Sequence, residues 1–179
     1  MARIPILAAL PPIAFAAIAG LFFSGMFRDD PDALPSMFAG QSAPHVTAEP
    51  LAGLTPFTDE ALQTPGPKLV NFWASWCRPC FLEHPQLMKL QAEGLPVYGV
   101  NFRDDPVRAL RFLNDFGDPF EGVGTDNEGR MALDWGVYGV PETFVIDGNG
   151  MVILRYQGPI TEEVLERRIR PALKEALAE

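Results

Sequence analysis

The chain of 179 residues contains two cysteines, Cys77 and Cys80, which stand three positions apart after an apolar run. Residues 68–73 are short, apolar and β-compatible, and residues 81–91 are good helix formers apart from one proline. Cys77 is therefore expected where a buried strand ends and a helix begins. The free N–H groups of a helix start carry partial positive charge, which favours a thiolate over a thiol. The spacing predicts a redox-active dithiol in which Cys77 is the nucleophile.

Cys80 is expected one helical turn further on, on the same side of the helix. There it is close enough to form a disulfide with Cys77 and is shielded by the helix, which suits a resolving thiol. A zinc site that adds His45 and His84 remains open, although these histidines form no second ligand pair at a usual spacing. A purely structural disulfide also remains open, although so small a loop removes little chain entropy. We expect a redox site that needs neither metal nor cofactor.

The N-terminal residues 4–27 carry no charge. As a helix they would extend roughly 36 Å, against about 30 Å for the hydrocarbon core of a bilayer. Positive charge precedes this run and residues 28–30 after it are net negative, which keeps the N-terminus in the cytoplasm and exports the rest. We therefore predict an uncleaved transmembrane anchor over residues 1–27. A cleaved signal peptide is the alternative, because residues 14–16 and 17–19 resemble cleavage sites, but the apolar run continues beyond both.

The chain after the predicted anchor divides into a tether and a domain. Residues 28–42 hold Asp, Pro, Gly and Ser with few apolar residues, which is typical of a linker. Residues 43–179 are enough for one domain with its own core. The formal net charge is −9 and the isoelectric point is near 4.7. Because nucleic acid repels an acidic chain, we expect no nucleic-acid partner.

The elements predicted for the domain alternate between strands and helices. Strands are expected over residues 68–73 and 96–102, and a helix over residues 106–116. This βαβ-type order implies parallel strands. Weaker signals predict a hairpin, a helix, a strand and a helix over residues 46–54, 58–62, 120–124 and 128–135, respectively.

The last part of the domain is expected to be antiparallel. Residues 142–147 and 151–156 flank a Gly-Asn-Gly turn and so predict a hairpin. A final helix over residues 161–177 should be kinked by Pro171. The sequence therefore predicts an α/β domain with a mixed sheet.

Two motifs carry a resemblance to a known family. Trp-Cys-x-x-Cys spans residues 76–80, and Gly-Val-x-Gly-x-Pro-Glu-Thr-Phe spans residues 136–144, just before the hairpin. Together they resemble the membrane-anchored, thioredoxin-like thiol:disulfide interchange proteins of cytochrome c maturation, the CcmG/DsbE group. The likeness runs from about Pro44 to the C-terminus, and the anchor fits as well. It implies a thioredoxin-like fold, with a mixed central sheet flanked by helices, preceded by one transmembrane helix.

The resemblance also implies how substrate is bound. In that family the proline matching Pro141 is cis and lies against the active-site disulfide. The backbone of the preceding residue, here Val140, pairs with an extended substrate segment. Trp76, beside the cysteines, is expected to line the substrate surface.

The chain departs from ordinary thioredoxins in its acidic groups. Asn71 stands where thioredoxins usually carry a buried aspartate on the strand leading to the active site. Glu83 follows Cys80 by three residues on the same helix, so its carboxylate is a candidate base, directly or through water. Glu142 is the candidate second acid. The alternatives are a solvated helix face for Glu83 and a loop-end carboxylate for Glu142.

The resemblance implies a thiol:disulfide oxidoreductase, a protein-disulfide reductase, anchored by a single pass in the bacterial inner membrane with its catalytic domain in the periplasm. Its implied task is to reduce the haem-binding cysteines of apocytochrome c. The implied partners are apocytochrome c or a CxxC-bearing maturation protein, and a membrane thiol electron donor. Two alternatives stay open: a general disulfide oxidant or isomerase on the same fold, and a non-catalytic holdase for apocytochrome.

Overall fold

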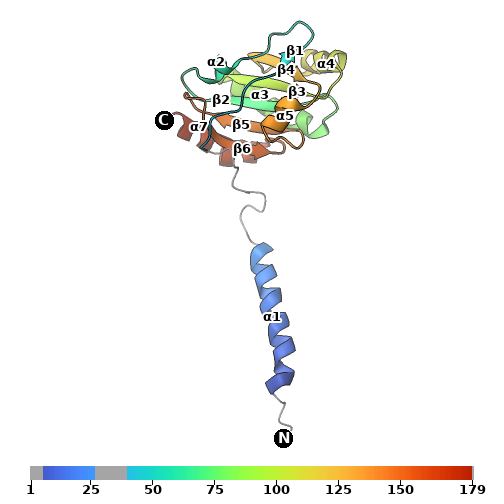
Figure 1. Cartoon of the computed structure of the whole chain (residues 1–179), viewed down its shortest axis with the longest axis vertical. Coiled ribbons are helices and arrows are strands. Elements are labelled where there is room, and N and C mark those ends of the chain that lie inside the picture. Colours follow the sequence, from blue (N-terminus) through green and yellow to red (C-terminus); the bar gives the residue numbers. More distant parts are fainter. Residues whose placement is uncertain (1–5, 27–39, 179) are drawn as a thin grey trace. The chain divides into compact units, whose positions relative to one another are not determined.

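The computed structural model describes residues 6–26 and 40–178. The chain divides into two units, Met1–Pro35 and Ser36–Glu179, and the first contains helix α1 (Ile6–Met26) (Figure 1). Among the described residues, no helix meets the length and hydropathy needed to cross a bilayer. Most of the predicted tether lies outside the described residues.

The second unit is built on one six-stranded sheet with the order β1-β4-β3-β2-β5-β6 (Figure 1). The neighbours of β3 run parallel to it, and the other pairs are antiparallel, so the predicted mixed sheet is confirmed. The strands are β1 (Glu49–Pro50), β2 (Lys68–Trp73), β3 (Val97–Phe102), β4 (Gly122–Asp126), β5 (Glu142–Ile146) and β6 (Val152–Gln157).

Helices cover both faces of the sheet (Figure 1). They are α2 (Asp59–Leu62), α3 (Arg78–Ala92), α4 (Pro106–Phe116), α5 (Arg130–Asp134), α6 (Glu162–Val164), the π-helix η1 (Leu165–Ile169) and α7 (Arg170–Ala176). The predicted helix over residues 106–116 is confirmed at both ends. Pro106 occupies the first turn, where its missing N–H costs nothing, and the Asp105 carboxylate accepts the Arg108 N–H.

Two predictions about elements need correction. The hairpin predicted over residues 46–54 is wrong, because only Glu49–Pro50 is a strand and it pairs with β4. Pro50 has no N–H to donate, which confines this segment to a sheet edge. The predicted C-terminal helix is present, but it contains the π-helical turn Leu165–Ile169 just before Pro171. The proline ring excludes a normal bond to the preceding turn, and a wider turn accommodates it.

The core alternates along β2, the strand at the centre of the sheet. Val70 and Phe72 pack with Trp135 on the face covered by α2 and α5. Leu69 and Trp73 point to the opposite face, which α3, α4 and α7 cover. Since successive side chains of a strand alternate, polar residue 71 also points toward the α3 face. Asn71 is thus a buried polar residue within an apolar layer, and it belongs to the candidate site described next.

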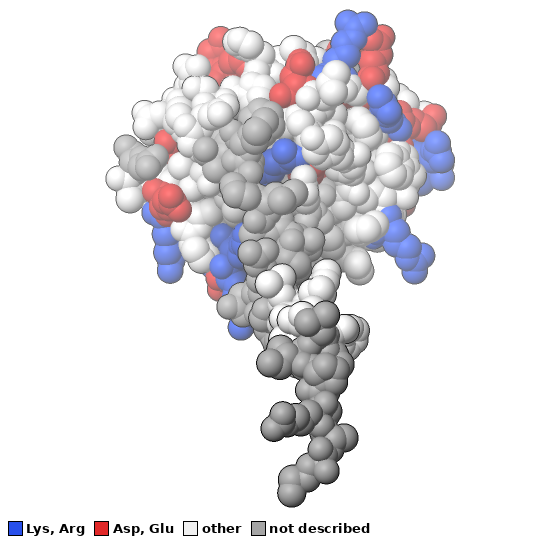
Figure 2. All heavy atoms as spheres, turned by 60° about the horizontal axis from the view of Figure 1, so that its bottom comes forward, with Lys and Arg blue, Asp and Glu red and all other residues white. Residues whose placement is uncertain are grey.

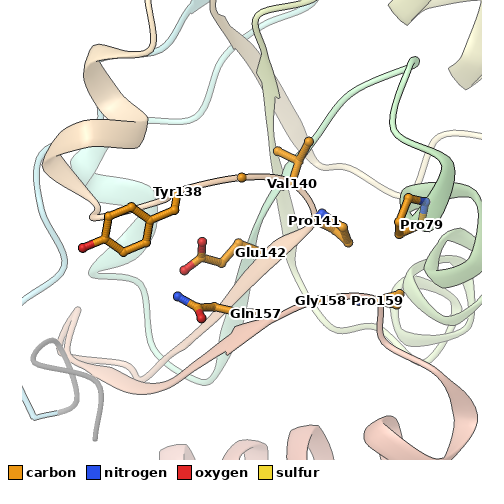
Figure 3. Close-up of a pocket in the computed structure, with 9 residues that line it drawn as sticks. Pro79, Tyr138, Val140, Pro141, Glu142, Gln157, Gly158 and Pro159 are labelled. Atoms are coloured by element: carbon orange, nitrogen blue, oxygen red, sulfur yellow. The ribbon is translucent and has the colours of Figure 1, made fainter. Parts of the chain in front are cut away.

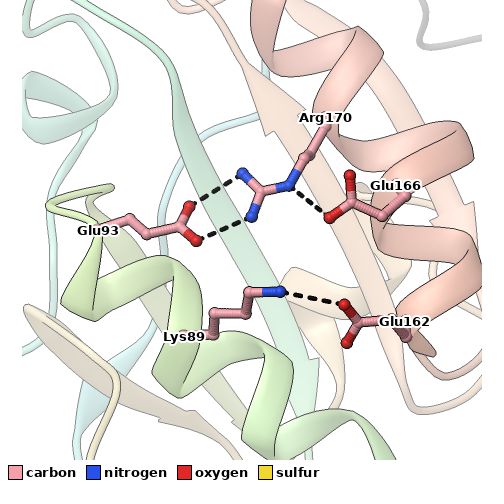
Figure 4. Close-up of polar contacts among 5 residues, drawn as sticks. All are labelled: Lys89, Glu93, Glu162, Glu166 and Arg170. Carbon is pink, nitrogen blue, oxygen red and sulfur yellow. Dashed lines mark hydrogen bonds and ion pairs between the residues drawn. The ribbon is translucent and has the colours of Figure 1, made fainter.

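Polar contacts fasten the C-terminal helices to α3 (Figure 4). The guanidinium of Arg170 donates two parallel hydrogen bonds to Glu93 at 2.8 and 2.9 Å, and a third to Glu166 at 2.8 Å. Lys89 of α3 pairs with Glu162 at 3.1 Å. The parallel fork geometry makes the Arg170 contacts directional as well as electrostatic.

A buried lysine closes the other end of the sheet. Lys68 is fully buried, and its ammonium donates to the carbonyls of Leu62, Thr64 and Asp147 at 3.0, 2.7 and 2.7 Å. Burial lowers its pKa. On the face shown in Figure 2, by contrast, basic and acidic side chains are interspersed around the rim.

Candidate active site

The two cysteines form a disulfide at the start of α3, with Cα atoms 5.3 Å apart. Cys77 is the N-cap of the helix, and its sulfur accepts the Cys80 backbone N–H at 3.2 Å. The helix begins at Arg78, so Cys77 stands at the helix start as predicted, and Pro79 fits the first turn. Cys77 is 3% exposed and Cys80 2%, so exposure hardly separates the two sulfurs. What separates them is the cap, since the N–H groups of the helix start point at Cys77.

Glu83 is fully buried one turn below Cys80. One carboxylate oxygen accepts the Asn71 amide N–H at 2.9 Å, and the other accepts the backbone N–H of Ile160 at 3.1 Å. Burial raises the pKa of Glu83 to about 8, against the opposing effect of both hydrogen bonds. Cys80 and Glu83 border the same gap in the packing, which is too small to hold a water molecule. The alternative of a solvated helix face is therefore wrong, and a buried carboxyl adjoins the second cysteine.

Asn71 ties three elements together beneath the disulfide. Its amide N–H₂ donates to Glu83 of α3 and, at 3.0 Å, to the Thr143 hydroxyl of β5. The Asn71 side chain thus holds the Glu83 carboxylate, which an aspartate at the same position would repel.

Glu142 is 1% exposed and pairs with Arg155 of β6, which also donates to the Gly136 carbonyl. Burial raises the pKa of Glu142, while Arg155 opposes that effect. Glu142 is the first residue of β5, directly after the loop that ends at Pro141. In the sheet register it lies opposite Phe72, whereas Thr143 lies opposite Asn71. Since strand side chains alternate, Glu142 and Glu83 lie on different faces of the sheet, and the structure does not bring them together.

A groove of about 420 Å³ is lined by Pro79, the residue just before Cys80, and by residues of the segments before β5 and after β6 (Figure 3). The Val140–Pro141 peptide bond is cis, and both residues line the groove. Its other walls are Pro79, Tyr138, Gly139, Glu142, Gln157, Gly158 and Pro159. Trp76 does not line this groove, although it is 52% exposed next to Cys77. Its indole N–H donates to the Arg103 carbonyl at 3.1 Å.

The histidines of the zinc alternative are engaged elsewhere. His84 lies against the Gly117 carbonyl, with its Nε2 at 3.0 Å, and burial lowers its pKa. His45 contacts Asp59 at 2.7 Å on the protein surface. Within residues 6–26 and 40–178, no three His, Cys, Asp or Glu side chains are grouped as a metal site. The arrangement that the zinc alternative requires is not formed.

Sequence reasoning missed Asp104, which follows β3. Its carboxylate accepts the N–H and the hydroxyl of Ser75, two residues before Cys77, at 2.5 and 2.8 Å. A signal was available, because β2 and β3 are parallel neighbours whose carboxyl ends meet at one edge of the sheet. Polar residues after the second strand are therefore expected beside the residues after the first.

Comparison with known proteins agrees with this geometry. The Redoxin family model matches residues 38–172. A thiol:disulfide interchange protein DsbE homolog of Paracoccus denitrificans is 51% identical over 178 residues, covering 99% of both chains. HelX of Rhodobacter capsulatus is 47% identical, covering 92% of this chain and 93% of that protein. DsbE of Escherichia coli K12 is 39% identical over 90% of each chain.

Solved structures show the same fold. The crystal structure of a thiol:disulfide interchange protein of the thioredoxin family from Chlorobium tepidum has a TM-score of 0.60 at 26% identity. It covers 74% of this chain and 95% of its own. The expected thioredoxin-like fold is thereby confirmed. With its Cys77–Cys80 disulfide, the chain belongs to the redoxin family and is a thiol:disulfide oxidoreductase of the DsbE/HelX kind.

Proposed function

We propose that this oxidoreductase reduces disulfides between the haem-binding cysteines of apocytochrome c, or in a CxxC-bearing maturation protein. The observation that carries the proposal is the buried Glu83 carboxyl beside Cys80, next to a groove lined by Val140 and Pro141. The Glu83 carboxyl provides proton transfer at Cys80. The groove provides a place for an extended peptide. The likeness to DsbE and HelX, both named thiol:disulfide interchange proteins, supports disulfide exchange as the reaction.

The reaction begins from the dithiol form. The Cys77 thiolate attacks one sulfur of the substrate disulfide, a mixed disulfide forms, and the other substrate sulfur leaves as a thiolate. Glu83 takes the proton of the Cys80 thiol. The Cys80 thiolate attacks the Cys77 sulfur and releases the second substrate thiolate. The substrate gains two electrons, and the protein is left with the Cys77–Cys80 disulfide.

Binding relies on the groove and on Trp76. The Val140 backbone pairs with an extended substrate segment, as in β-augmentation, and Pro141 packs against the reacting sulfurs. Trp76 offers an exposed aromatic surface on the Cys77 side. Glu142, held by Arg155, supplies an acidic group at the groove. No metal or cofactor takes part.

The cellular setting completes the proposal. Residues 1–27 anchor the chain in the bacterial inner membrane, residues 28–42 form a tether, and residues 43–179 act in the periplasm. A membrane thiol donor restores the dithiol. Intact-mass measurement of the mature protein should find residue 1 or 2 at the N-terminus in the membrane fraction. A soluble form beginning near residue 20 or 28 would refute the anchor.

Trapping the mixed disulfide tests the reductase function directly. Cys80→Ser should accumulate an adduct through Cys77 with an oxidised apocytochrome peptide carrying Cys-x-x-Cys-His, because the resolving thiol is missing. Cys77→Ser should form none on a non-reducing gel. Glu83→Gln, which keeps both thiols, should resolve the adduct more slowly. An adduct seen only with Cys77→Ser would reverse the two roles, and full function without both cysteines would favour the holdase.

A further inference from the structure

The turn that carries the nucleophile is fixed from outside by the segment after β3. Residues 74–77 form this turn, closed by the Cys77 N–H donating to the Ala74 carbonyl at 3.1 Å. Its two central residues, Ser75 and Trp76, each donate to that segment: Ser75 to the Asp104 carboxylate and Trp76 to the Arg103 carbonyl. Ser75 and Trp76 are therefore both held by the consecutive residues Arg103 and Asp104.

Asp104 is bonded in a way that only a carboxylate allows. It is 9% exposed and accepts four hydrogen bonds. One oxygen accepts the Ser75 N–H at 2.5 Å and the Asn101 amide at 3.0 Å; the other accepts the Ser75 hydroxyl and the Asp105 N–H, both at 2.8 Å. An amide in its place would turn an N–H₂ group toward one backbone N–H, whichever way it rotated. The position therefore discriminates against asparagine, its nearest isostere.

The neighbouring residue has a backbone conformation that needs support. Arg103 has φ of 45°, in the left-handed region, which is strained for a non-glycine residue. Its N–H donates to the Asp126 carbonyl at 3.2 Å, and its guanidinium donates to the Glu128 carbonyl at 3.3 Å. The hydrogen bond from the Trp76 indole thus ends on the carbonyl of a residue, Arg103, that is itself bonded to the end of β4 and to the loop after it. Such conformations persist at functional sites when the surroundings fix them.

We propose that Asp104 is a positioning residue, which holds the Ser75–Trp76 turn so that the Cys77 sulfur and the Trp76 indole meet the substrate disulfide in register. The role rests on the proposed reductase function and acts through Ser75, since Asp104 itself does not touch substrate. It carries a second consequence. The carboxylate places a fixed negative charge next to the turn of the Cys77 thiolate, which disfavours the dithiol form.

The test compares Asp104→Asn with Asp105→Asn in the full chain. Asp104→Asn should reduce the oxidised Cys-x-x-Cys-His peptide at least tenfold more slowly, at temperatures where circular dichroism shows both variants folded. Its dithiol–disulfide equilibrium with glutathione should shift at least threefold toward the dithiol. Asp105 is the matched control, because it is the adjacent acid and caps α4, a task that asparagine performs equally well. Asp105→Asn should stay within twofold of the wild type in both measurements.

A second variant decides the case if Asp104→Asn does not fold. Ser75→Ala removes only the hydroxyl bond to Asp104 and should slow peptide reduction about threefold. Combined with a folded Asp104→Asn, it should add little further loss. Wild-type rates in Ser75→Ala, or a folded Asp104→Asn with wild-type rate and equilibrium, would overturn the proposal.

The readouts also separate this proposal from the function on which it rests. The glutathione equilibrium and the rate of Cys77 alkylation by iodoacetamide involve no apocytochrome peptide. If the wild type did not reduce the peptide, the reductase function would fail. The shifted equilibrium and a changed alkylation rate in Asp104→Asn would still establish the positioning role, and their absence would refute it.

Discussion

Glu83 is a carboxyl group that the fold keeps from water, between Asn71 and the backbone N–H of Ile160. Its pKa of about 8 lies close to the ordinary value of about 8.5 for a cysteine thiol. Proton transfer is efficient between groups of matched pKa, so Glu83 is poised to exchange a proton with Cys80 near neutral pH. A solvent-exposed carboxyl near 4.5 would be a far weaker base.

The same burial should make the oxidised protein lose stability as pH rises. The pKa of Glu83 is raised from 4.5 unfolded to about 8 folded, so below pH 4.5 both states hold the proton. Between these limits the unfolded state alone releases it, which costs the fold up to about 1.4 kcal/mol per pH unit. Urea unfolding of oxidised protein from pH 5 to 8 should show this decline, and Glu83→Gln should flatten it.

Glu175→Gln provides the control for that measurement, since Glu175 is exposed on α7. It should leave the decline unchanged. Burial also raises the pKa of Glu142, so a smaller slope of the same sign should survive in Glu83→Gln. An unaltered decline in Glu83→Gln would show that Glu83 ionises as easily in the fold as outside it.

At the scale of elements, close backbone contacts decide where side chains are allowed. Strand β1 pairs with β4 at Gly124. A Cβ added to Gly124 would lie 2.6 Å from the Ala48 Cβ and 2.9 Å from the Glu49 carbonyl oxygen. A backbone carbonyl cannot move aside as a flexible side chain can. The edge strand therefore depends on glycine at this position.

Gly124→Ala should lower the free energy of unfolding by about 1–3 kcal/mol, because the overpacked edge must shift. Gly139→Ala is the matched control, since a Cβ there meets nothing within 4 Å. Thermal unfolding of both variants measures the difference. Equal midpoints would mean that β1 moves away from β4 at no cost.

The elements that sequence could predict are those with a strong local signal. The strand over residues 68–73 and the helix over residues 106–116 match the structure because apolar runs, Pro106 and Asp105 mark their limits. The hairpin predicted over residues 46–54 is wrong, since the short strand in this segment forms only by pairing with β4, which is distant in sequence. The π-helical turn before Pro171 likewise depends on packing of the C-terminal helices.

The candidate site was predictable where its residues are close in sequence. Cys77, Cys80 and Glu83 share one helix, so spacing alone relates them. The contact of Ser75 with Asp104 spans 29 positions, and that of Glu83 with Ile160 spans 77. Helical periodicity carries no information about such pairs. The separation of Glu142 from Glu83 by the sheet needed the register of β2 and β5.

For the whole molecule, opposing charges should set a reducing potential. The helix start and exposed Arg78 favour the Cys77 thiolate, whereas Glu142 and a net charge of −9 disfavour further negative charge. Glu83, with its pKa of about 8, adds to the second effect only to the extent that it is ionised. We expect a potential below about −180 mV, closer to thioredoxin than to the strong oxidants. Equilibration with dithiothreitol or glutathione buffers measures it. A value near −120 mV would support the oxidant alternative instead.

Lys68 gives this domain a built-in reporter of its own opening. The chain has three lysines, and Lys89 and Lys174 are accessible to solvent while Lys68 donates to three carbonyls inside the fold. An acylating reagent reaches an amine only when its nitrogen is free and deprotonated. Lys89 and Lys174 should be acylated promptly, and acylation at Lys68, resolved by peptide mass, should proceed only as fast as the sheet opens. Comparing the acylation rate of Lys68 in the oxidised and the reduced protein would show how strongly the redox state of the two cysteines affects the opening of the fold.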